Sequence, residues 1–254
     1  MKRKSALGLI VATPIAWMLG MIVSKLNIPV AHATSAPAAF TASYVTTTHN
    51  SANVELQRAE AVFAQRSDGS SVLLKKTAGP GVPSGTRRIL DVQKKRVVSV
   101  DPRTESISTF HYSDDELDHA RNPPLSCEQH GKPLAQDHQP QMKMEGLDVV
   151  RFSGKMSSTE NPVVRWMAPA LNCFVLQEEG TIVADQFRFR RTTASLSIGE
   201  PDPLLFEVPD SYTERSPSEV LALARVQMGL PETRNASHTY RSLDSIYKSR
   251  QEPK

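Results

Sequence analysis

Short runs of alternating apolar and polar residues, separated by turn residues, begin at Phe40 and continue through most of the chain. In the first run Phe40, Ala42 and Tyr44 lie two positions apart. This period of two is typical of strands that bury one face, and short runs joined by turns pair as local antiparallel hairpins. The pattern predicts a mainly β (α+β) fold built on an antiparallel sheet with a few covering helices.

Helix signals occur at two places in this pattern. Ser113 with Glu116 has the spacing of a capping box, and a proline-rich stretch that we interpret as a surface loop follows it up to residue 145. A second helix is predicted to begin at Ser216, where Pro217 and Glu219 complete the start signal, and to stop before Gly229. The predicted strands lie near residues 40–46, 59–65, 72–74, 87–92, 97–100, 105–110, 147–152, 163–167, 173–177 and 185–198.

The longest predicted strand, residues 185–198, changes parity along its length. Phe187 and Phe189 occupy odd positions, whereas Leu196 and Ile198 occupy even ones. A straight strand would place these side chains on both faces, and one extra residue within 190–193 restores a single face. We therefore predict a β-bulge there, with all four side chains pointing inward.

The first 33 residues have the pattern of an export signal. Three cations precede an uncharged apolar run from Ser5 to Ser24, and Ala31-His32-Ala33 provides the small residues of a cleavage site. An apolar run of this length is also long enough for an uncleaved membrane anchor. The sequence predicts a periplasmic or secreted protein, or alternatively a domain anchored in the inner membrane through residues 5–24.

These signals divide the chain into four parts. We expect a signal peptide or anchor in residues 1–33, the antiparallel β domain in 34–215, a C-terminal helix in 216–230, and a disordered polar tail in 231–254.

The charge of the exported part argues against nucleic-acid binding. Residues 1–33 hold four of the 30 cations and no acid, so the rest of the chain has 26 cations against 27 acidic residues. A nearly neutral domain lacks the basic surface that nucleic-acid binding requires.

The chain has two cysteines, Cys127 and Cys173. An even pair in an exported chain indicates a disulfide, which here closes a loop of about 45 residues. The alternative is a pair of separate buried thiols.

No catalytic signature is present, and we expect neither enzymatic activity nor a cofactor. One weak zinc candidate is present, consisting of Cys127, Glu128, Gln129 and His130 with Asp137 and His138. Because the chain has no second closely spaced pair of ligands, we expect no metal. The acids around Asp114 lack calcium-loop spacing, and no G-x-S-x-G motif marks a hydrolase serine.

Five aromatic residues are candidate ligand contacts, although core packing predicts the same residue types. These residues are Trp166, Phe174, Phe187, Phe189 and Phe206. A basic group either attracts lipid headgroups or forms a solvated, aggregation-resistant strand edge. This group consists of Arg87, Arg88, Lys94, Lys95 and Arg96.

The stretch Val163–Cys173 followed by Gly199–Tyr212 resembles the end of certain uncharacterised secreted bacterial proteins. More distantly it resembles the lipoprotein-carrier (LolA/LolB-like) superfamily. That resemblance implies a strongly curved antiparallel sheet, or half-barrel, with helices over its concave face and acyl chains in the cavity.

The combined pattern predicts a non-enzymatic periplasmic binding protein that holds a lipid, another hydrophobic moiety or a lipidated envelope protein. The alternative is a membrane-anchored envelope interaction or sensor module, and an exported hydrolase is a distant third.

Overall fold

The computed structural model describes residues 37–77, 83–120, 132–133, 142–155, 161–182 and 187–228. All of them belong to the unit that begins at Ala36. The predicted export segment and polar tail, and most of the loop that holds Cys127, lie outside the described residues, so the predicted domain boundaries stay predictions.

Strands dominate the described chain. They are β1 (Phe40–His49), β2 (Glu55–Gln65), β3 (Ser71–Lys75), β4 (Arg87–Asp91), β5 (Arg96–Asp101), β6 (Ser106–His111), β7 (Lys132–Pro133), β8 (Met142–Met144), β9 (Leu147–Lys155), β10 (Pro162–Ala168), β11 (Phe174–Ile182), β12 (Phe187–Ile198) and β13 (Thr213–Glu214). The described residues also form two α-helices, α1 (Asp114–Ala120) and α2 (Pro217–Gln227), and 3-10 helices at Pro169–Leu171 and Pro203–Phe206.

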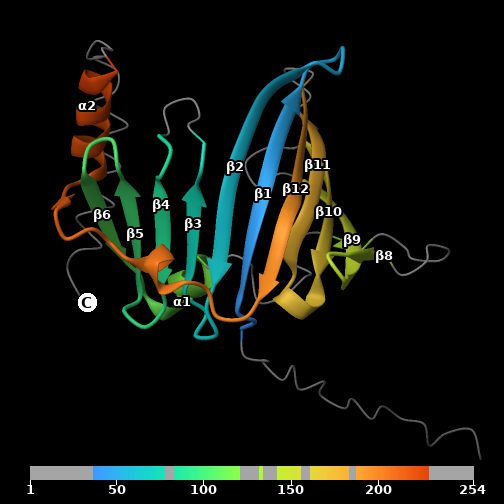
Figure 1. Cartoon of the computed structure of the whole chain (residues 1–254), viewed down its shortest axis with the longest axis horizontal. Coiled ribbons are helices and arrows are strands. Elements are labelled where there is room, and N and C mark those ends of the chain that lie inside the picture. The colour runs from blue at the N-terminus through green and yellow to red at the C-terminus, as the bar shows by residue number, and fades with distance from the viewer. Residues whose placement is uncertain are drawn as a thin grey trace, which may run out of the picture. The chain divides into compact units, whose positions relative to one another are not determined.

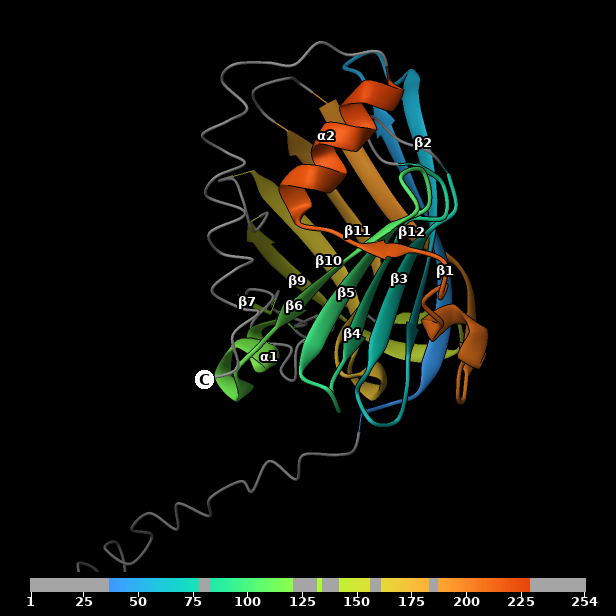
Figure 2. The same ribbon diagram turned by 90° about the vertical axis from the view of Figure 1, so that its left-hand side faces the viewer.

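These strands form one curved sheet that does not close. Its order is β13-β6-β5-β4-β3-β2-β1-β12-β11-β10-β9-β7, and β8 pairs with β9 (Figure 1). The described pairings are antiparallel except for β13 beside β6. Figure 2 shows the sheet curling until β3–β6 stand in front of β9–β12. The predicted fold class, a curved antiparallel sheet with few helices, is confirmed.

The hairpins form where the sequence supplies turn residues. Between β4 and β5 the Asp91 carboxylate accepts a hydrogen bond from the Lys94 amide at 3.0 Å, and Lys95 adopts a φ of 47°. Between β5 and β6 the Asp101 carboxylate accepts from the Arg103 amide at 2.8 Å. Aspartate caps the backbone of a tight turn in this way, which fixes the register of the hairpin that follows.

The longest strand contains a β-bulge as predicted, but not within the predicted segment 190–193, where the ladder with β1 is unbroken. Ser195 lies opposite Ser43 and Thr193 lies opposite Tyr44, so Ala194 is the extra residue in β12. This is one position beyond the predicted segment 190–193. Side chains at 187, 189, 191, 193 and 196 are partly or fully buried, and Arg188 and Arg190 are exposed.

The prediction that Ile198 faces a buried interior is wrong, because its side chain is 62% exposed. It shares a face with Leu196 and lies opposite Phe40 in the last β1–β12 pair. The chain turns away at Gly199 directly afterwards, so no neighbouring strand covers the side chain.

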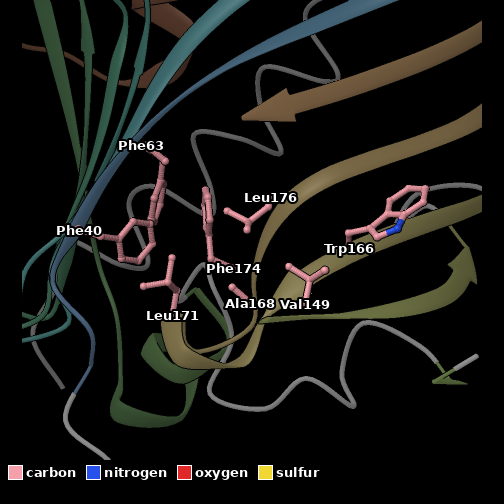
Figure 3. Packing of buried hydrophobic residues seen from close by; sticks show 9 residues of the cluster. Phe40, Phe63, Val149, Trp166, Ala168, Leu171, Phe174 and Leu176 are labelled. Atoms are coloured by element: carbon pink, nitrogen blue, oxygen red, sulfur yellow. The ribbon is translucent and has the colours of Figure 1, made fainter. Parts of the chain in front are cut away.

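The main core lies between the two walls of the curved sheet (Figure 3). Phe40 and Phe63 extend from β1 and β2 toward Phe174 of β11, and Leu171 packs beside them. Val149 and Trp166 continue the cluster across β9 and β10. Burial of large aromatic side chains supplies most of the stabilisation at such a position.

Two smaller clusters cover opposite faces of β4 and β5. Leu117 of α1 packs on Leu90 and Val97. Ile89 and Val98, which adjoin Leu90 and Val97 in these strands, point to the opposite face of the sheet. They are covered by the segment after β12, including Leu205 and Phe206, which crosses this face in Figure 1.

Both predicted capping boxes are present. The Ser216 hydroxyl accepts from the Glu219 amide, and the Glu219 carboxylate accepts from the Ser216 amide at 2.7 Å. Ser113 and Glu116 make the same reciprocal contacts at the start of α1. Neither helix, and no other helix of the described residues, is long and apolar enough to cross a membrane.

Candidate functional site

The structure separates the five aromatic residues that the sequence identified as candidate ligand contacts. Trp166 and Phe174 are 8% and 6% exposed and belong to the main core. Phe187 and Phe189 are partly buried on β12. Phe206 packs on the second cluster, where the Arg66 guanidinium lies 3.9 Å from its ring centroid. Among the hollows formed by described residues, Phe189 and Phe206 therefore line two different ones.

The aromatic core is filled. The ring centroids of Phe40 and Phe174 are 4.9 Å apart, and those of Phe63 and Phe174 are 5.1 Å apart. Rings at such distances are in direct contact. Of the two interpretations of Phe174, core packing is the one that its surroundings support.

A hollow opens next to this core on the same face of β1 and β2. Tyr44 packs against the core cluster, and Ala61 and Ala59 lie opposite Tyr44 and Thr46 in the register. We name this hollow, of about 390 Å³, the β1–β3 groove. Its lining residues are Tyr44, Thr46, Gln57, Ala59, Glu60, Ala61, Leu73, Lys75, Thr77 and Arg191.

The groove exists because alanines replace larger side chains in β2. One pair further along the same face, Phe63 lies opposite Ala42 and fills the space with its ring. At Ala61 and Ala59 the side chain ends at Cβ, and the hollow begins there. The apolar surface thus continues from a packed core into an open groove.

Charged side chains border this groove on its β12 side. Glu178 of β11 accepts from Arg165 at 2.8 Å and lies 3.3 Å from an Arg191 nitrogen. The Arg191 guanidinium lies 5.4 Å from the Tyr44 ring centroid. Burial raises the pKa of Tyr44, the positive charge of Arg191 lowers it, and the negative charge of Glu178 raises it. One carboxylate between two guanidiniums leaves excess positive charge beside the groove.

A second, larger hollow lies where β1, β10, β11 and β12 meet near their ends. We name this hollow, of about 710 Å³, the β12 cavity. Phe189 is the one predicted ligand contact among its lining residues, and the groove and this cavity have no described lining residue in common. The lining residues are His49, Asn53, Pro162, Val163, Val164, Glu179, Gly180, Thr181, Arg188, Phe189 and Arg190.

Most of the basic group at β4 and β5 is occupied within the protein. Arg96 pairs with Asp91 at 3.4 Å, and Lys95 pairs with Asp114 at 2.8 Å. Arg87 donates to the backbone carbonyl of Glu207 at 3.0 Å. These contacts do not favour a headgroup site, and the group is not a strand edge either, because β4 and β5 are each paired on both sides.

Other predicted site residues lie outside the described part of the chain. These are Cys127, Glu128, Gln129, His130, Asp137 and His138. Cys173 is buried in a cluster with Met167 and Val175, and no cysteine of the described residues is free. The Cys127–Cys173 bond stays a prediction. Within the described ranges no three His, Cys, Asp or Glu side chains gather as a metal site would require.

The groove residues were missed by sequence reasoning. Tyr44 and Arg191 are 147 positions apart and become neighbours only because β1 pairs with β12. The alternation of alanines at positions 59 and 61 is visible in the sequence, but it signals a hollow only once their cross-strand neighbours are known.

No family model matches the chain, and no curated protein matches it. Several solved structures show a similar arrangement at low identity. An uncharacterised conserved protein from Thermus thermophilus is 9% identical, with 72% of this chain and 93% of that chain covered and a TM-score of 0.43. The MucA/MucB complex from Pseudomonas aeruginosa is 11% identical, with 70% of this chain and 58% of that chain covered and a TM-score of 0.42.

A LolA superfamily protein from Nitrosomonas europaea is also similar. It is 10% identical, with 69% of this chain and 94% of that chain covered and a TM-score of 0.32. A protein of the LolA superfamily is thus among the similar structures. At these scores we infer no activity from the likeness.

Proposed function

We propose that this protein is a non-enzymatic periplasmic binding protein that holds a hydrophobic moiety in the β1–β3 groove. The moiety is the acyl part of a lipid or of a lipidated envelope protein. The observation that carries the proposal is the apolar wall that runs from the packed aromatic core past Tyr44 to Ala61 and Ala59 and then opens into a hollow of about 390 Å³.

The physical basis is the cost of exposing apolar surface to water. Removing such surface from water contributes about 25 cal/mol per Å², and ligand sites in proteins are mostly apolar hollows with a few polar groups at the border. Here Tyr44, Ala61 and Leu73 provide the apolar part. Lys75 and Arg191 provide the polar border. An acyl chain fits this composition because it has an apolar body and leaves its polar end at the border.

The export pattern of residues 1–33 supports a location outside the cytoplasm, either as a free periplasmic or secreted protein or as a domain anchored in the inner membrane. A lipid or lipidated protein is available as a ligand in that compartment.

Native mass spectrometry of protein purified from its own cells without detergent tests the proposal. The wild-type chain should retain lipid, and Ala59→Trp should lower the retained fraction at least about tenfold, because the indole fills the groove. Arg58→Trp is the matched control, since it introduces the same side chain at the neighbouring, exposed position of β2. Wild-type protein without lipid, or equal retention by Ala59→Trp, would contradict the proposal.

A second candidate function, an envelope interaction module, is favoured by α2. Ala224 is the buried residue of this helix, whereas Leu221 and Val226 are 40% and 69% exposed. Apolar side chains on an exposed helix are typical of a surface that binds another protein. In the same mass spectra a module of this kind would carry no lipid and would co-purify with a partner that Val226→Asp removes.

A further inference from the structure

We propose that the β12 cavity is an anion-binding site that recognises a phosphate or carboxylate group through Arg188 and Arg190, and that it is separate from the β1–β3 groove. The anion is either the headgroup of a lipid or a free ion.

The sheet register places the cationic side chains on one face. Arg188 lies opposite His49 of β1 and Thr181 of β11. Arg190 is two positions further along β12, so it points to the same side as Arg188. Directly opposed residues share a face, and the two arginines and His49 therefore border the same hollow of about 710 Å³.

These two arginines differ from their neighbour Arg191. Arg191 points to the opposite side of β12 and is paired with Glu178 at 3.3 Å. Arg188 and Arg190 are exposed and have no ion pair among the described residues. One acid, Glu179, lies opposite Arg190 in the register, which leaves the hollow with excess positive charge.

A protected strand edge does not explain this charge. Arginine and lysine often keep an exposed edge strand from pairing with other molecules. However, β12 is paired on both sides, with β1 and with β11. A guanidinium provides parallel N–H donors that match the oxygens of phosphate and carboxylate, and two of them side by side form a suitable anion site.

The same hollow also has apolar lining residues, and Phe189 points to the opposite face of β12 from Arg188 and Arg190. The Phe189 ring lies over Gly180, so closely that a Cβ at position 180 would come within 2.7 Å of the ring. Pro162 and Val163 add apolar surface beside it. A comparison of an anion that carries an apolar tail with the bare anion therefore decides whether these residues contact a ligand held by the arginines.

Calorimetric titration of the full-length Ala59→Trp variant, in which the indole fills the β1–β3 groove, with three probes tests the inference. Octyl phosphate supplies the anion and an apolar tail, inorganic phosphate supplies the anion alone, and octyl glucoside supplies the tail with a neutral head. The Ala59→Trp chain should bind octyl phosphate, and adding Arg188→Gln and Arg190→Gln to it should weaken this binding at least about tenfold. Arg58→Gln, which removes an exposed arginine of β2, should leave binding unchanged.

The outcomes separate this site from the groove. The groove is filled in the Ala59→Trp chain, and position 59 is not among the cavity residues, so octyl phosphate binding to this chain reports on the cavity. Equal binding of inorganic and octyl phosphate would assign the site to a free ion and support anion recognition. Absence of octyl phosphate binding to the Ala59→Trp chain, equal binding with and without the two arginines, or equal binding of octyl glucoside would overturn the inference.

Discussion

At the scale of single residues, Tyr44 connects the core, the groove and the charge network. Its ring packs on the aromatic cluster, and its surroundings include the Arg191 guanidinium at 5.4 Å. Burial is the largest influence on its phenol and raises its pKa. The folded protein therefore holds Tyr44 neutral at pH values where the unfolded chain, with an ordinary pKa of about 10, begins to ionise.

This difference predicts how stability depends on pH. The contribution of Tyr44 is fully present below a pH of about 10 and is lost as the pH rises through the folded-state pKa, because the unfolded state ionises first. Tyr44→Phe should therefore lose less unfolding free energy than wild type above that pH. Urea unfolding at a series of pH values measures this change, and the phenolate absorbance of wild type minus Tyr44→Phe locates the pKa. Parallel stability curves for the two proteins would contradict the prediction.

At the scale of elements, the bulge at Ala194 determines which side chains of β12 are buried. Leu196 and Ile198 share a face beyond the bulge, but Leu196 packs against the main core and Ile198 lies at the open end of the strand. The two residues are similar in type but differ in burial. Substitutions at these positions therefore distinguish the stabilisation that comes from packing from the stabilisation that comes from strand propensity.

Leu196→Ala should lower the free energy of unfolding by about 2 kcal/mol, since it removes apolar contacts from a partly buried site. Ile198→Ala should change it by less than about 0.5 kcal/mol, as should Ser197→Ala on the other face. Chemical denaturation with a common slope measures all three variants. A loss at Ser197→Ala as large as that at Leu196→Ala would mean that the buried face of β12 is misassigned.

The elements also indicate how far the sequence can predict this fold. The hairpins, the bulge and both capping boxes were predictable because each depends on residues close together in the chain. The outer half of β2 was not predicted, since Glu55 to Arg58 are exposed and lack an apolar alternation. The extension of β11 from Gln177 to Ile182 was missed for a similar reason, because its partly buried residues Glu178 and Glu179 are charged.

At the scale of the whole molecule, long-range strand pairing creates both candidate sites. Thr46 lies between Ala59 of β2 and Arg191 of β12, so the groove depends on contacts between distant parts of the chain. No local pattern specifies such a pairing. The Phe residues were recognisable as buried or ligand-facing, but the alternation could not distinguish the core position of Phe174 from the cavity position of Phe189.

The predicted Cys127–Cys173 bond also acts at this scale, because it would tie the proline-rich loop to the start of β11. Cys173 is 5% exposed and packs with Met167 and Val175, so a free thiol there would be shielded from most reagents until the chain unfolds.

Thiol counting must therefore use denatured, unreduced protein, and it should detect no free thiol. Cys127→Ser should then lower the free energy of unfolding by about 4 kcal/mol under oxidising conditions, because the unfolded chain regains the freedom of a loop of about 45 residues. Under reducing conditions wild type and Cys127→Ser should unfold at similar denaturant concentrations. Two titratable thiols in the denatured, unreduced protein would show that the two cysteines are not bonded.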